Sequence, residues 1–128
     1  MKQCRRRVLI VEGNEDNREG LRLIFDSLGH TVECAGTGSR AIAMAAAWYP
    51  DFVVLDLGLP DLPGEEVAGT LKRFPRPPFI VGFSGYHRRA EAARIAGCDA
   101  FVIKPNLDAV LELATTVVLL HRPAGEVG

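Results

Sequence analysis

Five short runs of strand-forming residues, separated by segments with helical spacing, constrain the fold of this chain more than any other feature. The strands are expected at residues 8–11, 31–35, 52–55, 79–83 and 100–103. The central run at 52–55 is too short for a helix. It is bounded by Pro50 and by the Gly- and Pro-rich residues 57–64. A short, uninterrupted apolar run of this kind predicts a strand that is buried on both faces.

The segments between these strands carry the signals of helices. In the first helix, Asn14 is the expected N-cap, and apolar residues recur at the spacing i, i+3, i+4 and i+7. That apolar face consists of Leu21, Ile24, Phe25 and Leu28. Further helices are expected up to about Tyr49, over 65–74, over 88–96 and from 107 to about 121. In the helix over 88–96, Ala92, Ala93 and Ile95 are the expected packing residues.

Strands that alternate with helices predict an α/β fold, namely a doubly wound, five-stranded parallel sheet with helices on both faces. Parallel neighbours require right-handed crossover connections, and helices supply them. The length of 128 residues is that of one domain. Periodicity alone does not give the order of the strands.

Polar residues follow four of the strands, at the point where each strand ends. These residues are Glu12, Asp56, Ser84 and Lys104. In a parallel sheet the carboxyl ends lie at one edge, where open α/β sheets bind their ligands. Each residue has an ordinary interpretation on its own, as a solvated acid, a turn residue or a surface lysine. Their joint placement favours a site.

The residue types at this edge suit phosphoryl chemistry. A carboxylate such as Asp56 can attack phosphorus and form an aspartyl phosphate. The negative charge that meets there calls for a hard cation bound by oxygen ligands, a fixed ammonium and hydrogen-bond donors. Glu12 would help to hold Mg²⁺, Lys104 would pair with a phosphoryl oxygen, and the Ser84 hydroxyl would donate a hydrogen bond.

Four segments taken together resemble the receiver domain of two-component response regulators, in order and over about residues 7–120. They are VLIVE at 8–12, VLDLGLPDLPG at 54–64, FSG at 83–85 and AGCDAFVIKP at 96–105. The resemblance implies a flavodoxin-like (βα)5 fold with strand order 2-1-3-4-5. It implies that Asp56 accepts a phosphoryl group from a histidine kinase or phosphotransfer protein. It also implies an acceptor domain that assists its own phosphorylation and dephosphorylation and is not an enzyme.

The resemblance assigns further roles. Asp56 and the backbone carbonyl of Gly58 would be further ligands of the metal, and the Lys104–Pro105 peptide bond would be cis. Phe101 and Ser84 would form a switch that responds to phosphorylation. The signal would reach a downstream protein through the face built by the fourth helix, the fifth strand and the fifth helix. A homodimer is a further possibility, because apolar residues 117–120 of the last helix run consecutively.

One position departs from the family pattern. Receiver domains usually carry two adjacent acids after the first strand, and the second position is Gly13 here. Glycine removes a charge and a ligand oxygen, so we expect weakened Mg²⁺ affinity. The sequence leaves open whether Glu15, Asp16 or the longer Glu12 compensates.

Two other functions remain open. The segment GTGSRA at residues 36–41 fits a dinucleotide-binding G-x-G-x-x-A motif, with Asp56 about twenty residues further on. The motif is weak by itself, and the chain lacks room for two mononucleotide-binding halves. The second alternative is a pseudo-receiver that acts by protein contact without phosphorylation, which Gly13 favours.

Composition bounds the partners and the location. Fifteen Lys and Arg against sixteen Asp and Glu give no reason to expect nucleic-acid binding by this chain. The basic residues 1–6 are expected to be a solvated lead-in, 7–121 the receiver domain and 122–128 a flexible tail. Three widely spaced cysteines fit a reducing cytoplasm, and no window is long enough for a membrane span. The chain is either a stand-alone receiver or part of a larger protein.

Overall fold

The computed structural model describes residues 6–120, without the side chains of His87 and residues 117–120. Its elements, in chain order, are β1 (Arg7–Val11), α1 (Glu15–Ser27), β2 (Thr31–Ala35), α2 (Gly38–Trp48), β3 (Phe52–Asp56), α3 (Gly64–Lys72), β4 (Phe79–Ser84), the 3₁₀ turn η1 (His87–Arg89), α4 (Ala90–Ala96), β5 (Ala100–Ile103) and α5 (Leu107–Leu120). The predicted alternation of strands and helices is confirmed. Within the described part of the chain, no helix is both long enough and apolar enough to cross a membrane.

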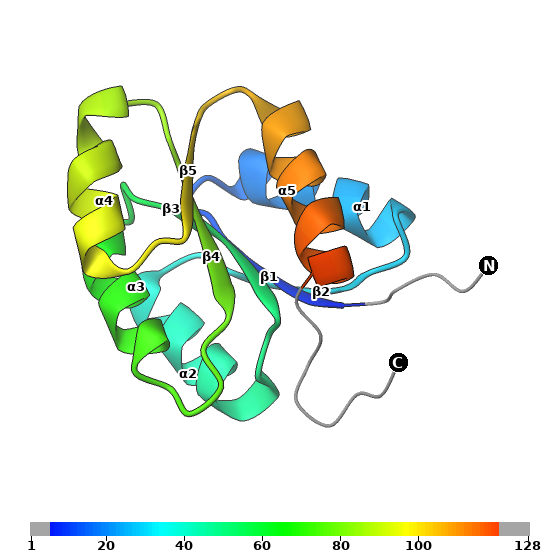
Figure 1. Ribbon diagram of the computed structural model, residues 1–128, viewed down its shortest axis with the longest axis horizontal. Helices are drawn as coiled ribbons and strands as arrows, with labels where there is room; N and C mark the ends of the chain where they lie inside the picture. Colours follow the sequence, from blue (N-terminus) through cyan, green and yellow to red (C-terminus); the bar gives the residue numbers. More distant parts are fainter. Residues whose placement is uncertain (1–5, 121–128) are drawn as a thin grey trace.

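The strands form one parallel sheet in the order β2-β1-β3-β4-β5. The doubly wound class and the order implied by the resemblance are therefore confirmed. Helices α1 and α5 cover one face of the sheet, and α2, α3 and α4 cover the other (Figure 1). The three-layer arrangement buries both faces of the central strands, as parallel sheets require.

The central strands alternate between two cores. In β1 and β3, one set of side chains packs toward α2 and α3, and the other set packs toward α1 and α5. All eight residues at 8–11 and 52–55 are at most 2% exposed. The uninterrupted apolar runs are explained by this two-sided burial.

The helix over 88–96 is the least accurate part of the sequence prediction. The structure has η1 first, and α4 begins only at Ala90. Only Ala93 is buried in α4, and Ile95 is 73% exposed. The expectations that Ala92 and Ile95 pack inward are wrong: both are exposed, and Ile95 lies two positions after Ala93, roughly 200° further around an α-helix, so it faces away from the core.

The basic lead-in also needs a correction at Arg6. This residue is 7% exposed rather than solvated. Its carbonyl oxygen accepts a hydrogen bond of 2.9 Å from the Thr31 N–H, so its backbone lies beside β2. The remaining lead-in residues 1–5 and the expected tail at 122–128 lie outside the described residues.

Candidate functional site at the carboxyl edge of the sheet

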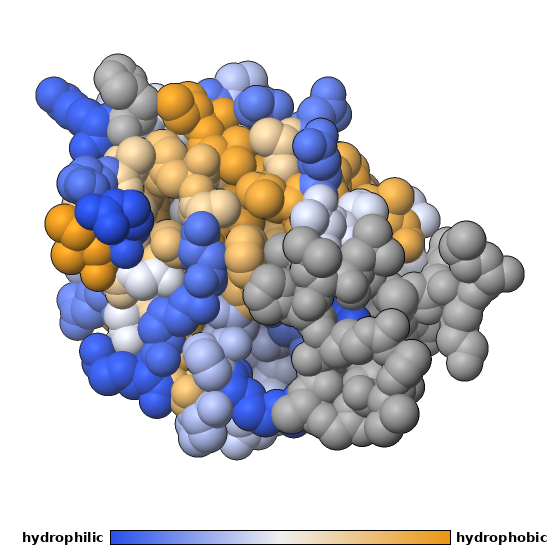
Figure 2. Space-filling model, in the orientation of Figure 1, coloured by the Kyte–Doolittle hydropathy of each residue, from blue (hydrophilic) through white to orange (hydrophobic). Residues whose placement is uncertain are grey.

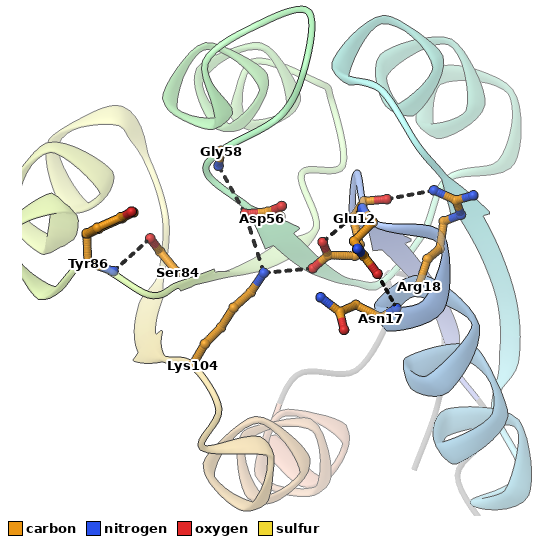
Figure 3. A network of polar contacts seen from close by, with 9 residues as sticks. Glu12, Asn17, Arg18, Asp56, Gly58, Ser84, Tyr86 and Lys104 are labelled. Atoms are coloured by element: carbon orange, nitrogen blue, oxygen red, sulfur yellow. Dashed lines mark hydrogen bonds and ion pairs between the residues drawn. The ribbon is translucent and has the colours of Figure 1, made fainter.

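The sheet brings together the four polar residues that the sequence singled out. The registers of β1, β3, β4 and β5 place Glu12, Asp56, Ser84 and Lys104 at one edge of the sheet. In Figure 3 their side chains gather above the strand ends. The predicted assembly of the site is therefore seen in the structure, whereas the role of each residue stays a prediction.

Lys104 lies between the two acids of the site. Its Nζ atom is 2.9 Å from Glu12 Oε1 and 3.6 Å from Asp56 Oδ1 (Figure 3). The side chains of Glu12, Asp56 and Lys104 are 4%, 14% and 26% exposed. Ion pairs at this depth are screened by water less than surface pairs, so the ammonium neutralises part of the acidic charge.

Glu12 is held in place by the loop that follows β1, by α1 and by β2. The Asn14 N–H donates to its second carboxylate oxygen, Oε2, at 3.2 Å. Arg18 Nη1 donates to the backbone carbonyl of Glu12 at 2.9 Å. The backbone N–H of Glu12 donates to the Ala35 carbonyl at 3.1 Å. Both carboxylate oxygens of Glu12 thus have a partner within the protein.

Asp56 begins the loop between β3 and α3. The Gly58 N–H donates to Asp56 Oδ1 at 3.0 Å, which fixes the carboxylate relative to the loop. The carbonyl role expected for Gly58 stays a prediction. Near the other end of the loop, the Gly64 N–H donates to the Leu57 carbonyl at 3.1 Å. These two hydrogen bonds make the β3–α3 loop, residues 57–63, compact; we call it the acceptor loop.

Ser84 and Phe101, the expected switch residues, lie on adjacent strands. Ser84 is 3% exposed, and its Oγ accepts a hydrogen bond of 3.2 Å from the Tyr86 N–H. Phe101 is half-buried and packs against the core under α2, α3 and α4, next to Gly82 of the adjacent strand. The Lys104–Pro105 peptide bond is cis, as the resemblance implied.

Asp61 is a structural residue of the acceptor loop that the sequence analysis did not identify. Its carboxylate accepts hydrogen bonds from the Gly38 N–H at 2.7 Å, the Ser39 N–H at 3.0 Å and the Ser39 hydroxyl at 2.8 Å. It therefore joins the β3–α3 loop to the N-terminus of α2. An acid in a Pro-containing loop is the only local signal, because the partners lie more than twenty residues away.

The same contacts argue against the dinucleotide interpretation of residues 36–41. A bound pyrophosphate would need the N–H groups at the start of the helix that follows the glycines. In the structure the N–H groups of Gly38 and Ser39 donate hydrogen bonds to the Asp61 carboxylate. The chain fills this anion site with its own carboxylate.

The contacts of Asp61 predict a pH-dependent contribution to stability. The Ser39 and Gly38 N–H groups and the Ser39 hydroxyl lower the pKa of Asp61 to about 2. A carboxyl whose pKa is lowered on folding stabilises the fold above its unfolded pKa of about 4, and the contribution is lost as the pH falls toward 2. Wild type is therefore expected to melt above Asp61→Asn at neutral pH, and this difference should shrink between about pH 4 and pH 2. Thermal melts across this range provide the test, and a constant difference would refute the assignment.

The donor set does not fit a magnesium site in its present arrangement. Mg²⁺ prefers octahedral oxygen ligands and loses its water reluctantly. Gly13 supplies no carboxylate, and Glu12 uses both of its oxygens for Lys104 and Asn14. Asp16 lines a cavity of about 300 Å³ next to Glu12 and Lys104. Even so, no group of three or more His, Cys, Asp or Glu side chains among the described residues is placed to hold a metal.

Comparison with known proteins identifies the family. Residues 8–115 match the family described as response regulator receiver domain. The transcriptional regulatory protein KdpE of Mycobacterium tuberculosis is 33% identical over 121 residues, covering 93% of this chain and 54% of its own length. The KDP operon transcriptional regulatory protein KdpE of Escherichia coli K12 is 38% identical over 119 residues, covering 91% and 52%. The chain thus spans about half the length of these relatives.

A solved structure supports the same conclusion. The response regulator TrrA of Thermotoga maritima, in complex with Mg(2+)-BeF, superimposes with a TM-score of 0.80 at 25% identity. The match covers 88% of this chain and 98% of that one. With the family match over most of the chain, these findings show that the protein belongs to the response regulator receiver domain family of two-component systems.

Proposed function

We propose that this receiver domain accepts a phosphoryl group on Asp56 from a histidine kinase or phosphotransfer protein and passes the signal to a protein target. The observation that supports this most is the ammonium of Lys104, 3.6 Å from the Asp56 carboxylate at the end of β3. A carboxylate can attack a phosphoryl group only where the mutual repulsion of the anions is offset. Lys104 offers that compensation.

The proposed transfer uses the free oxygen of Asp56. Oδ1 accepts the Gly58 N–H and faces Lys104, so we assign the attack to Oδ2. A bond forms between Oδ2 and phosphorus while the bond from phosphorus to the donor's imidazole nitrogen breaks. The electron pair of that bond stays on the nitrogen. The product is an acyl phosphate, and the domain is a stoichiometric acceptor rather than an enzyme with turnover.

Ser84 is oriented to stabilise the transferred group. Its Oγ accepts the Tyr86 N–H, which engages a lone pair and leaves the hydroxyl proton available as a donor. In the proposed reaction this proton is donated to a phosphoryl oxygen. The new bond would draw Ser84 toward Asp56 and so connect the site to Phe101 on the adjacent strand.

The proposed output surface is the face formed by α4, β5 and α5. Hydrophobic residues gather along β5 between these helices (Figure 2). Ile103 on β5 is 44% exposed, Ile95 on α4 is 73% exposed, and a contiguous exposed apolar patch is typical of a contact surface. A downstream protein is the proposed partner, and a second copy of the chain is the alternative occupant. The proposed location is the cytoplasm.

A phosphorylation-independent pseudo-receiver is the second candidate, and Gly13 is the observation that favours it. Without a second acid after β1, the domain has fewer ligands for the cation that assists transfer in its family. In this case the same α4–β5–α5 face would bind its partner whether or not Asp56 carries phosphate.

Intact mass spectrometry after incubation with acetyl phosphate distinguishes the two candidates. An acceptor is expected to gain one phosphoryl group, because acetyl phosphate carries the same transferable group as phosphohistidine. Circular dichroism on the same sample establishes that the protein is folded. A folded protein that gains no mass from acetyl phosphate or from a phosphorylated histidine phosphotransfer protein would favour the pseudo-receiver.

A further inference from the structure

We infer that the Lys104 ammonium has taken over the place of the divalent cation in this site, so that the resting domain is indifferent to Mg²⁺. This inference rests on the proposed function, because it concerns the charge balance of the acceptor site. It differs from a loss of the site, since the carboxylates remain and are neutralised from within the chain. Two independent observations carry it.

The first observation is the position of the ammonium. Lys104 Nζ contacts Glu12 at 2.9 Å and lies 3.6 Å from Asp56, so a positive charge already sits between the two acids. The Asn14 N–H donates to the other carboxylate oxygen of Glu12, so each oxygen already has one partner within the chain. A metal ion would have to compete with Lys104 for a carboxylate that is 96% buried, and the ion pair between them would have to break first.

The second observation is the packing at Gly13. A Cβ atom at this position would lie 3.3 Å from Pro60 Cδ and 3.9 Å from the Gly36 carbonyl oxygen. The acceptor loop, which Asp61 anchors to α2, therefore lies close against the position where a second acid would begin. Position 13 therefore adds no carboxylate to the site, and the loop packed against it leaves a longer side chain little room.

The charge balance leads to the same result. Two carboxylates and one ammonium leave a single net negative charge at Glu12, Asp56 and Lys104, and the nearby Asp16, which lines the adjoining cavity, is exposed to solvent. A site with one negative charge attracts a divalent cation far less than one with two. Removing Lys104 restores the second charge and leaves Glu12 buried without its partner, which makes a cation favourable again.

Thermal melts with EDTA and with millimolar MgCl₂, at matched ionic strength, test this inference. The wild type is expected to melt within about 1 °C in the two buffers, because a ligand stabilises only what it binds. Lys104→Met is expected to melt at a lower temperature than wild type in EDTA. With MgCl₂ its melting temperature is expected to rise by about 4 °C. The matched control, Glu12→Gln with Lys104→Met, lacks the carboxylate that needs a cation and should not respond to MgCl₂.

Each outcome decides the question. A saturable rise in the wild-type melting temperature with MgCl₂ would overturn the inference, and so would a folded Lys104→Met that ignores MgCl₂. If Lys104→Met does not fold, calorimetric titration of wild type with MgCl₂ decides, and binding at submillimolar concentration overturns the inference. These melts do not involve phosphate. Tight Mg²⁺ binding with phosphoryl uptake would therefore refute only this inference, whereas a Mg²⁺-indifferent domain without uptake would refute only the proposed function.

Discussion

Gly64→Ala is expected to lower the free energy of unfolding by about 3 kcal/mol, the upper part of the range for overpacking a well-packed interior. A Cβ atom at residue 64 would lie 2.5 Å from Leu57 Cα and 2.9 Å from the Asp56 carbonyl oxygen. Backbone atoms cannot move aside as flexible side chains do. The acceptor loop would have to open, and the hydrogen bond from the Gly64 N–H to Leu57 would be strained.

The same substitution at Gly20 provides the matched control, with the opposite sign. Gly20 lies inside α1, and a Cβ atom there would meet nothing within 4 Å. Alanine is preferred over glycine in a helix interior by roughly 0.5–1 kcal/mol, so Gly20→Ala is expected to stabilise the domain by this amount. Urea denaturation of both variants measures the two changes. Equal effects at the two positions would contradict the close packing assigned to Gly64.

Asp56→Asn is expected to abolish phosphoryl uptake without unfolding the domain. The amide has the shape of the carboxylate, and its oxygen can still accept the Gly58 N–H. It is not a nucleophile toward phosphorus, because its nitrogen lone pair is delocalised into the carbonyl. Lys104 keeps its shorter contact, to Glu12, so the stability should stay within about 1 kcal/mol of wild type. Intact mass after incubation with acetyl phosphate, together with a thermal melt, measures both effects.

A second change from carboxylate to amide separates the role of Asp56 from a general loss of charge. Glu66 is exposed on α3, and Glu66→Gln is expected to take up phosphate as wild type does. Uptake at the wild-type extent in Asp56→Asn would show that another group is the acceptor.

The sequence predicted the sheet and the position of the site because both depend on local patterns. Short apolar runs such as residues 52–55 mark strands that are buried on two sides, and polar residues at strand ends converge wherever strands run parallel. The strand order and the cis peptide at Lys104–Pro105 followed from the resemblance rather than from these patterns.

Features that depend on contacts distant in sequence were not predicted. Asp61 caps α2 across more than twenty residues, and no local pattern reports that pairing. The contact of Lys104 with Glu12, ninety-two residues away, was not predicted, and its expected pairing with a phosphoryl oxygen stays a prediction. Ile95 was misplaced because a helix of 7 residues is too short for its periodicity to show which face is buried, and the structure buries Ala93.

The most direct test of the proposed acceptor role is to locate the phosphoryl group in the wild-type chain. Borohydride reduces an aspartyl phosphate to homoserine, which peptide mass spectrometry can place at a single residue. After incubation with acetyl phosphate, we expect homoserine at residue 56 and unmodified carboxylates at Glu12 and Asp61. A reduced residue at either of those positions, or none in a protein that has gained a phosphoryl group, would contradict it.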